Sequence, residues 1–149
     1  MTNQEIHQGR CLCGQVQYKV QGSPLIVAHC HCEDCQRLTG AGHSTGAMFN
    51  ARTLELMGEV AEYKLTSENG NEVTRVFCPV CGSPILGRNT GMPGTITLSL
   101  GTMEDSSVFE PGVVVFARNR KAWDMMDESI ETHAAQPAWS PENGAGAPE

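Results

Sequence analysis

The stretch Ala28-His29-Cys30-His31-Cys32-Glu33-Asp34-Cys35-Gln36-Arg37-Leu38-Thr39-Gly40 places three cysteines in the pattern Cys-x-Cys-x-x-Cys. Side chains alternate along a strand, so Cys30 and Cys32 point to the same face if the stretch begins as extended chain. A tight turn after Cys32 then brings Cys35 to the same point. No fourth cysteine lies nearby in the sequence. Three protein ligands with one open position are typical of catalytic zinc.

The other four cysteines come in two pairs. Cys11 and Cys13 form a Cys-x-Cys near the N-terminus, and Cys78 and Cys81 form a Cys-x-x-Cys within Phe77-Cys78-Pro79-Val80-Cys81-Gly82-Ser83-Pro84. Two pairs of thiolates make a closed tetrahedral sulfur site, which is typical of structural zinc. All seven cysteines are then assigned, four to a structural site and three to a catalytic one.

The length and net charge of the chain limit the kinds of partner that the protein can have. The 149 residues fit a single domain, and the net charge of −7 argues against nucleic-acid binding, for which a basic face is expected. No apolar run reaches the roughly 18 residues of a membrane-spanning helix, and residues 1–7 lack the basic and apolar regions of a signal peptide. We therefore expect a cytoplasmic protein without a membrane or nucleic-acid partner, in which closely spaced cysteines bind metal.

The hydrophobic pattern predicts a mainly β chain. Strands are expected over 9–20, 25–32, 43–49, 54–57, 59–65, 72–77, 94–100 and 113–116, with an Asn-Gly hairpin turn at Asn69 and Gly70. Short helical or amphipathic segments are expected over 33–38, 103–107 and 123–130. We expect one zinc-binding domain over 1–133 and a disordered tail over 134–149, with Trp139 as a loose anchor. Trp123 is expected in the core, and the carboxylates from Glu104 to Asp127 on the surface.

Three motifs together resemble the glutathione-dependent formaldehyde-activating enzyme family. They are Gly9-Arg10-Cys11-Leu12-Cys13-Gly14-Gln15-Val16-Gln17-Tyr18, the segment from Cys30 to Ala41, and Phe77-Cys78-x-x-Cys81-Gly82-Ser83-Pro84. The resemblance covers roughly residues 8–125, including Trp123 at a position where the family often has tryptophan. Gln36 departs from the pattern, because the family often has a basic residue there.

The resemblance implies a zinc-stabilised β-tent, with two or more small antiparallel sheets joined by a four-cysteine zinc site and few short helical turns. It implies two zinc ions per chain: a structural ion on Cys11, Cys13, Cys78 and Cys81, and a catalytic ion on Cys30, Cys32 and Cys35. The implied activity joins formaldehyde to glutathione as S-hydroxymethylglutathione, formally a carbon–sulfur lyase reaction in reverse.

The ligand chemistry is consistent with that activity. A thiol that binds zinc loses its proton, and the resulting thiolate can attack an aldehyde carbon to give a hemithioacetal. The expected partner is therefore a small thiol or thiol adduct. Nearby residues expected to contact the substrate or move its proton are Arg37, His31 and His43, with His29 as a further candidate.

Other interpretations stay open at the level of sequence. The three cysteines could form a closed structural site with His31 or a distant histidine, although His31 and His29 alternate with the cysteines and so face away on a strand. They could also hold an iron–sulfur cluster or act as a redox sensor. The main alternative to an enzyme is a zinc-stabilised β-module that binds a basic protein partner, for which a second, open site would be superfluous.

Overall fold

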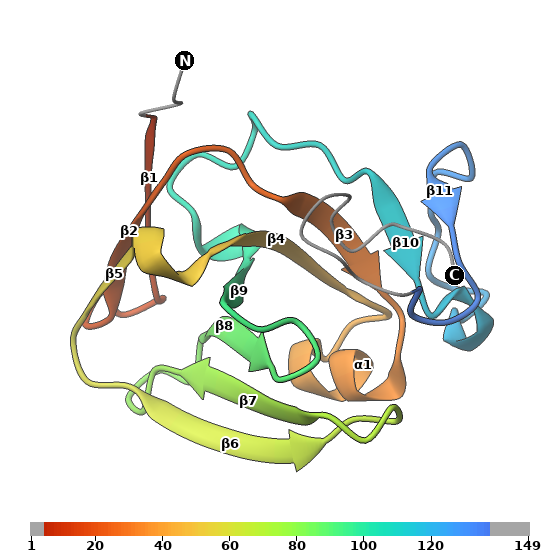
Figure 1. Cartoon of the computed structure of the whole chain (residues 1–149), viewed down its shortest axis with the longest axis horizontal. Coiled ribbons are helices and arrows are strands. Elements are labelled where there is room, and N and C mark those ends of the chain that lie inside the picture. The colour runs from red at the N-terminus through yellow and green to blue at the C-terminus, as the bar shows by residue number, and fades with distance from the viewer. Residues whose placement is uncertain (1–4, 138–149) are drawn as a thin grey trace.

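The computed structural model describes residues 5–137, which form eleven strands and one α-helix (Figure 1). Short 3₁₀ turns occupy Ala51–Thr53, Leu100–Thr102 and Ala117–Asn119. No helix in this part of the chain is long and apolar enough to cross a membrane. The elements are β1 (Ile6–Arg10), β2 (Gln17–Gln21), β3 (Ile26–Cys30), α1 (Glu33–Thr39), β4 (Ser44–Asn50), β5 (Leu54–Met57), β6 (Ala61–Thr66), β7 (Glu72–Phe77), β8 (Pro84–Asn89), β9 (Thr95–Ser99), β10 (Val113–Val115) and β11 (Glu131–Thr132).

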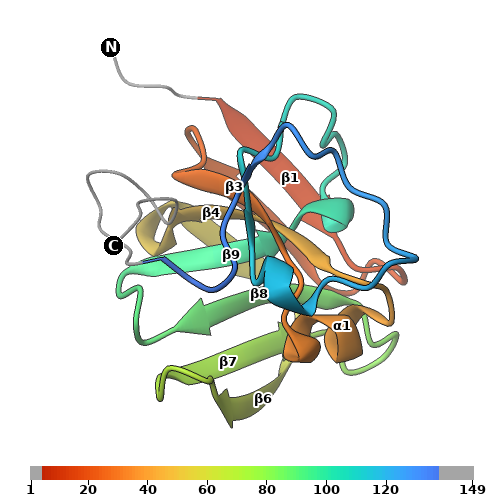
Figure 2. The same cartoon turned by 90° about the vertical axis from the view of Figure 1, so that its right-hand side faces the viewer.

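The strands make two sheets, which confirms the mainly β prediction. A small antiparallel sheet has the order β1-β2-β5, and a large sheet has the order β11-β10-β3-β4-β9-β8-β7-β6. Figure 2 shows the large sheet descending from β3 to β6 as a curved layer. The large sheet is not purely antiparallel, because β10 runs parallel to both β3 and β11.

Alternate side chains give the two faces of the large sheet different roles. Val27, Ala47 and Leu98 point to one face and belong to the hydrophobic core, which also contains Val16 and, from β2 of the small sheet, Tyr18 and Val20. The intervening residues on the opposite face line a cavity, among them Ala28, Gly46 and Thr97. The small sheet therefore covers one face, and the other is left for binding.

The predicted strand over 9–20 is wrong in one respect. The chain forms two antiparallel strands, β1 and β2, and Cys11 and Cys13 lie in the loop between them. Gly14 has a φ of 86°, a left-handed conformation that glycine adopts readily, and it follows the second cysteine directly. Because the chain reverses here, the thiols of Cys11 and Cys13 come together in a loop and not on one face of a continuous strand.

The predicted strand over 25–32 ends earlier, at Cys30. Cys32 is the N-cap of α1, and its sulfur accepts a hydrogen bond of 3.4 Å from the Cys35 amide. Helix α1 is longer than the predicted 33–38 by one residue, and its C-cap is Gly40, which has a φ of 72°. The cap replaces the last extended residues and turns Cys35 toward the other two thiols.

The C-terminal part of the domain differs most from the prediction. No helix forms over 123–130, and Trp123 is 68% exposed rather than in the core. Asp124, expected on the surface, is buried instead. No helix forms over the predicted 103–107, and the 3₁₀ turn at Leu100–Thr102 ends just before this segment. Trp139 and most of the predicted tail, residues 138–149, lie outside the described residues.

Candidate metal centres and the cavity

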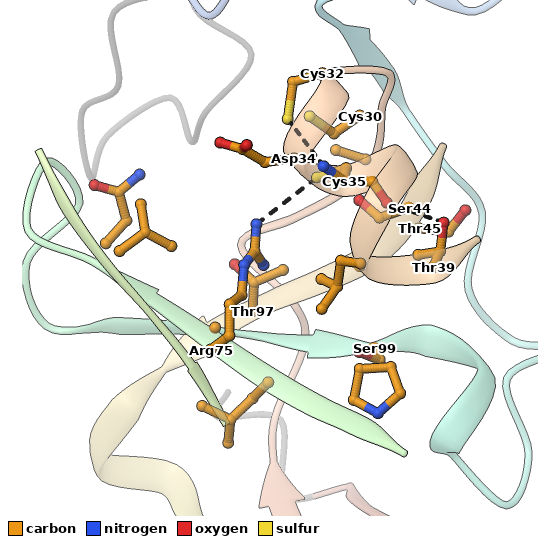
Figure 3. A pocket seen from close by; sticks show the side chains of 18 of the residues that line it. Cys30, Cys32, Asp34, Cys35, Thr39, Ser44, Thr45, Arg75, Thr97 and Ser99 are labelled. Carbon is orange, nitrogen blue, oxygen red and sulfur yellow. Dashed lines mark hydrogen bonds between the residues drawn. The ribbon is translucent and has the colours of Figure 1, made fainter. Parts of the chain in front are cut away.

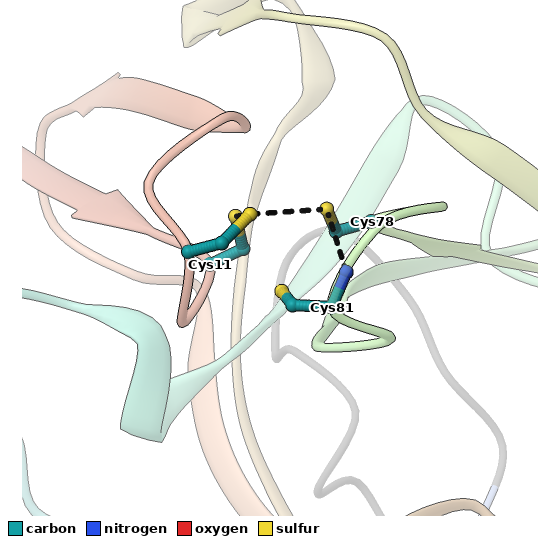
Figure 4. A group of neighbouring side chains, drawn as sticks. Cys11, Cys78 and Cys81 are labelled. Carbon is teal, nitrogen blue, oxygen red and sulfur yellow. Dashed lines mark hydrogen bonds between the residues drawn. The ribbon is translucent and has the colours of Figure 1, made fainter.

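The four paired cysteines converge where the two sheets meet (Figure 4). The β1–β2 loop of the small sheet supplies Cys11 and Cys13, and the β7–β8 loop of the large sheet supplies Cys78 and Cys81. The Cys11 and Cys13 sulfurs are 3.6 Å apart, and those of Cys13 and Cys78 are 3.8 Å apart. Sulfurs about 2.3 Å from a zinc ion at tetrahedral angles are about 3.8 Å from each other. These residues therefore fit a zinc ion with four thiolate ligands.

Backbone amides surround this group of sulfurs. Val16 N–H donates to the Cys11 sulfur at 3.2 Å, and the amides of Val80 and Cys81 donate to the Cys78 sulfur at 3.4 and 3.5 Å. Hydrogen bonds from the Ser83 side chain and backbone lower the pKa of Cys81 to about 5. Cys11 and Cys78 are fully buried, Cys81 is half-buried and Cys13 is exposed. Four convergent thiols with amide donors suit a closed, structural site.

The remaining three cysteines form a second group at the junction of β3 and α1. Cys30 ends β3, Cys32 caps the helix, and Cys35 lies in its first turn. Their sulfurs lie within 4.8 Å of one another. Within residues 5–137, no other Cys, His, Asp or Glu ligand atom joins them at this distance. The donor set suits a zinc ion with three thiolate ligands and an open fourth position.

These three cysteines stand at one end of a cavity of about 860 Å³ (Figure 3). Its floor is one face of the large sheet, to which Gly46 and Gly87 contribute no side chain. A Cβ at Gly46 would lie 2.5 Å from the Thr97 methyl group. The charged residues that line the cavity have both signs: Glu33, Asp34, Glu68, Arg75 and Arg88.

Arg75 is the cation that reaches the cysteines. Its Nη2 donates to the Cys35 sulfur at 3.7 Å. Hydrogen bonds from Cys30 and Cys32, together with the charge of Arg75, lower the pKa of Cys35 to about 2, against the opposing effect of burial. Hydrogen bonds with Cys32 and Cys35, together with burial, raise the pKa of Cys30. Arg75 therefore favours the ionised form of Cys35.

The structure places His31 and His43 beside Asp124 rather than beside the three cysteines. His43 Nδ1 is 2.7 Å and His31 Nδ1 is 3.3 Å from Asp124 Oδ2, and His31 also donates to the Gly42 carbonyl at 3.0 Å. His29 bonds Thr45 at 2.7 Å on the side of β3 opposite Cys30. Burial lowers the pKa of His29 to about 4, so the ring is neutral near pH 7.

The other predicted substrate contacts are placed differently. Arg37 is 76% exposed and pairs with Glu33 at 3.5 Å, one helical turn away, so it does not face the cysteines. His43 reaches the edge of the cavity, with its Nδ1 on Asp124. Gln36 donates to the carbonyls of His31 and Asn119, at 2.8 and 3.1 Å, and so ties the cysteine turn to the C-terminal segment.

Two residues of this region were absent from the site predicted by sequence. The sequence offers a pattern that points to Arg75, because it is a charged residue between Val73 and Phe77 on one face of a predicted strand. No sequence pattern points to Asp124, because it lies in irregular chain beside an exposed tryptophan.

Comparison with known proteins agrees with this architecture. A crystal structure of a Rhodobacter sphaeroides protein superposes with a TM-score of 0.54 at 20% sequence identity, covering 70% of this chain and 91% of that one, which supports the fold. None of the curated proteins compared with the chain matches it. Residues 6–119 match a family described as glutathione-dependent formaldehyde-activating enzyme. Because this match spans more than half of the chain, the protein belongs to the glutathione-dependent formaldehyde-activating enzyme family.

Proposed function

We propose that the protein makes or breaks the carbon–sulfur bond between a small thiol and an aldehyde, with S-hydroxymethylglutathione as the model substrate. In this role it is a zinc-dependent carbon–sulfur lyase. The observation that carries the proposal is the convergence of Cys30, Cys32 and Cys35 at the end of a cavity without a fourth protein ligand in the described chain. A purely structural site would be closed.

The donor sets support two zinc ions per chain. The ion on Cys30, Cys32 and Cys35 supplies a position at which a thiol binds as its thiolate. Arg75, whose Nη2 lies 3.7 Å from the Cys35 sulfur, favours the thiolate form of this ligand. Helix α1 and strand β3 hold the three sulfurs on one side, so an incoming thiol enters from the cavity.

The cavity supports a substrate of glutathione size. Its volume of about 860 Å³ lies within the range of roughly 300–1,000 Å³ typical of small-molecule sites. Carboxylates and guanidinium groups both line it, which matches a thiol that carries both ammonium and carboxylate groups. The seven free cysteines favour a reducing compartment, so we infer a cytoplasmic location.

The decisive experiment is exchange between free and formaldehyde-bound glutathione, followed by NMR against a control without protein. We expect the zinc-loaded protein to accelerate exchange and to hold two zinc ions. The Cys35→Ser variant should hold one and exchange at the control rate. A wild-type protein that holds two zinc ions but does not accelerate exchange would contradict this substrate. Equal acceleration by wild type and Cys35→Ser would contradict the role of the three cysteines.

A further inference from the structure

Arg75 is fixed in the cavity by the sheet beneath it. It shares a face of β7 with Val73 and Phe77, which line the same cavity. Its partner across the β7–β8 pair is Gly87, and a Cβ at that position would lie 2.9 Å from the Arg75 Nη1 atom. The missing side chain at position 87 therefore leaves space for the guanidinium to lie over β8.

From this position the guanidinium points at the cysteine group. Figure 3 shows Arg75 rising from the sheet toward Cys35, and its Nη2 is 3.7 Å from the Cys35 sulfur. In the described part of the chain no carboxylate oxygen lies within 4.0 Å of Arg75, whereas Arg37, Arg88 and Arg118 each pair with a glutamate. Arginine carries five N–H donors, so donors remain for a ligand beside Cys35.

The reaction creates an anion at that location. When the sulfur of the bound thiol forms a bond to the aldehyde carbon, the π electron pair of the carbonyl moves to its oxygen. The resulting alkoxide is one carbon away from the attacking sulfur. It then takes a proton from solvent, which balances the proton that the thiol released on binding. Arginine stays protonated throughout, so it can stabilise this charge but does not supply the proton.

We propose that Arg75 is a catalytic residue that donates hydrogen bonds to the oxygen of the thiol–aldehyde adduct. The inference rests on the proposed function and adds a residue to it. In enzymes that stabilise an oxyanion, removal of one donor lowers kcat by roughly 100- to 1,000-fold. We expect Arg75→Gln to lower kcat by about this factor, with a smaller change in KM.

The first test compares Arg75→Gln and Arg75→Lys with Arg52→Gln, each zinc-loaded. Arg52 is exposed on a 3₁₀ turn outside the cavity, so its substitution controls for the loss of one positive charge. We expect two zinc ions in all three variants, a large loss of kcat in Arg75→Gln and a partial loss in Arg75→Lys. Arg75→Gln with wild-type kcat would overturn the inference, and so would a variant that loses zinc from the three-cysteine site.

A second test does not depend on turnover. Thioacetate carries an oxygen one carbon from its sulfur, as the adduct does, and ethanethiol lacks it. Both can be titrated into cobalt-substituted protein and followed by thiolate-to-cobalt absorption. We expect the ratio of the two affinities to fall at least tenfold from wild type to Arg75→Gln, and not in Arg52→Gln. An unchanged ratio would overturn the inference.

The two tests separate the inference from the proposed function. A wild-type protein that leaves glutathione–formaldehyde exchange at the control rate would refute the proposed substrate, whatever the affinity ratio. An active wild type with an equally active Arg75→Gln variant would refute only the role of Arg75.

Discussion

Asp124 holds together three segments that are distant in the sequence. Its carboxylate lies at hydrogen-bond distance from His43, before β4, and close to His31, before α1. Gly42 permits this approach, because a Cβ there would lie 2.4 Å from Asp124 Oδ2. Arg120 Nε also donates to the Asp124 carbonyl at 2.8 Å. The buried Asp124 carboxylate therefore holds together the segments that flank the turn from Cys30 to Cys35.

Substitution of Asp124 by alanine should destabilise the protein. It removes the acceptor of the His43 ring, whose side chain is 24% exposed, whereas His31 keeps the Gly42 carbonyl as its acceptor. One poorly paired donor costs about 1–3 kcal/mol. Urea unfolding of the zinc-loaded protein measures the effect. Glu110→Ala, at an exposed carboxylate, should change the free energy of unfolding by less than about 0.5 kcal/mol. Equal stability of the two variants would contradict the role of Asp124.

Gly87 offers a separate test of how the cavity is shaped. A methyl group at this position would meet the Arg75 guanidinium, the mobile end of a long side chain, so the fold should tolerate it. We expect Gly87→Ala to keep its zinc and its melting temperature but to exchange glutathione-bound formaldehyde more slowly. Gly112→Ala, where a Cβ meets no atom within 4 Å, is the matched control. Equal formaldehyde-exchange rates in the Gly87→Ala and Gly112→Ala variants would show that activity does not require the Arg75 guanidinium to lie over β8.

At the scale of elements, the two cysteine groups differ in what they join. The β1–β2 and β7–β8 loops belong to different sheets, so an ion held by the four cysteines would link the sheets. The three-cysteine site lies within the short stretch from the end of β3 to the first turn of α1. A link between distant segments constrains the unfolded chain far more than a link between close neighbours.

Two serine substitutions should therefore have different consequences. Cys78→Ser should severely destabilise or unfold the protein, because structural zinc contributes directly to folding free energy. Cys35→Ser should leave the circular dichroism spectrum largely unchanged while one zinc ion is lost. Thermal unfolding together with metal analysis distinguishes the variants. A stable Cys78→Ser protein, or a Cys35→Ser protein that aggregates to the same degree, would contradict this division.

Local patterns in the sequence predict the strands and the two cysteine groups well. Alternation placed Val16, Tyr18 and Val20 on one buried face, and the paired motifs brought four sulfurs together. The hydrophobic pattern does not encode the reversal between β1 and β2, because the turn at Gly14 belongs to the loop that carries Cys11 and Cys13 and not to an alternating strand. It also misses Asp124, whose burial depends on segments over 80 residues away in the chain.

At the scale of the whole molecule, the two sites differ in coordination. The four-cysteine group, in which Cys11 and Cys78 are buried and Cys13 is exposed, offers four ligands from two sheets. The three-cysteine group offers three ligands at a cavity of about 860 Å³. A chelator can therefore bind at the open fourth position of the second site from the cavity, whereas at the first site it must displace a thiolate.

Chelation should consequently remove activity before it removes structure. In excess chelator we expect one zinc ion to leave in a fast phase together with activity, and the second in a slow phase together with the circular dichroism signal. Zinc added back after the fast phase should restore activity. Release of both ions in a single phase, coincident with unfolding, would contradict the difference in coordination.

The alternation of side chains across the large sheet has a consequence for how this protein can diverge. Val27, Ala47 and Leu98 maintain the core, and their neighbours Ala28, Gly46 and Thr97 shape the cavity from the same strands. The cavity-facing positions can therefore change, in concert where they touch as Gly46 and Thr97 do, while the intervening ones preserve the fold. New substrate preferences can evolve by substitutions on one face of the sheet, at little cost to the stability that the other face provides.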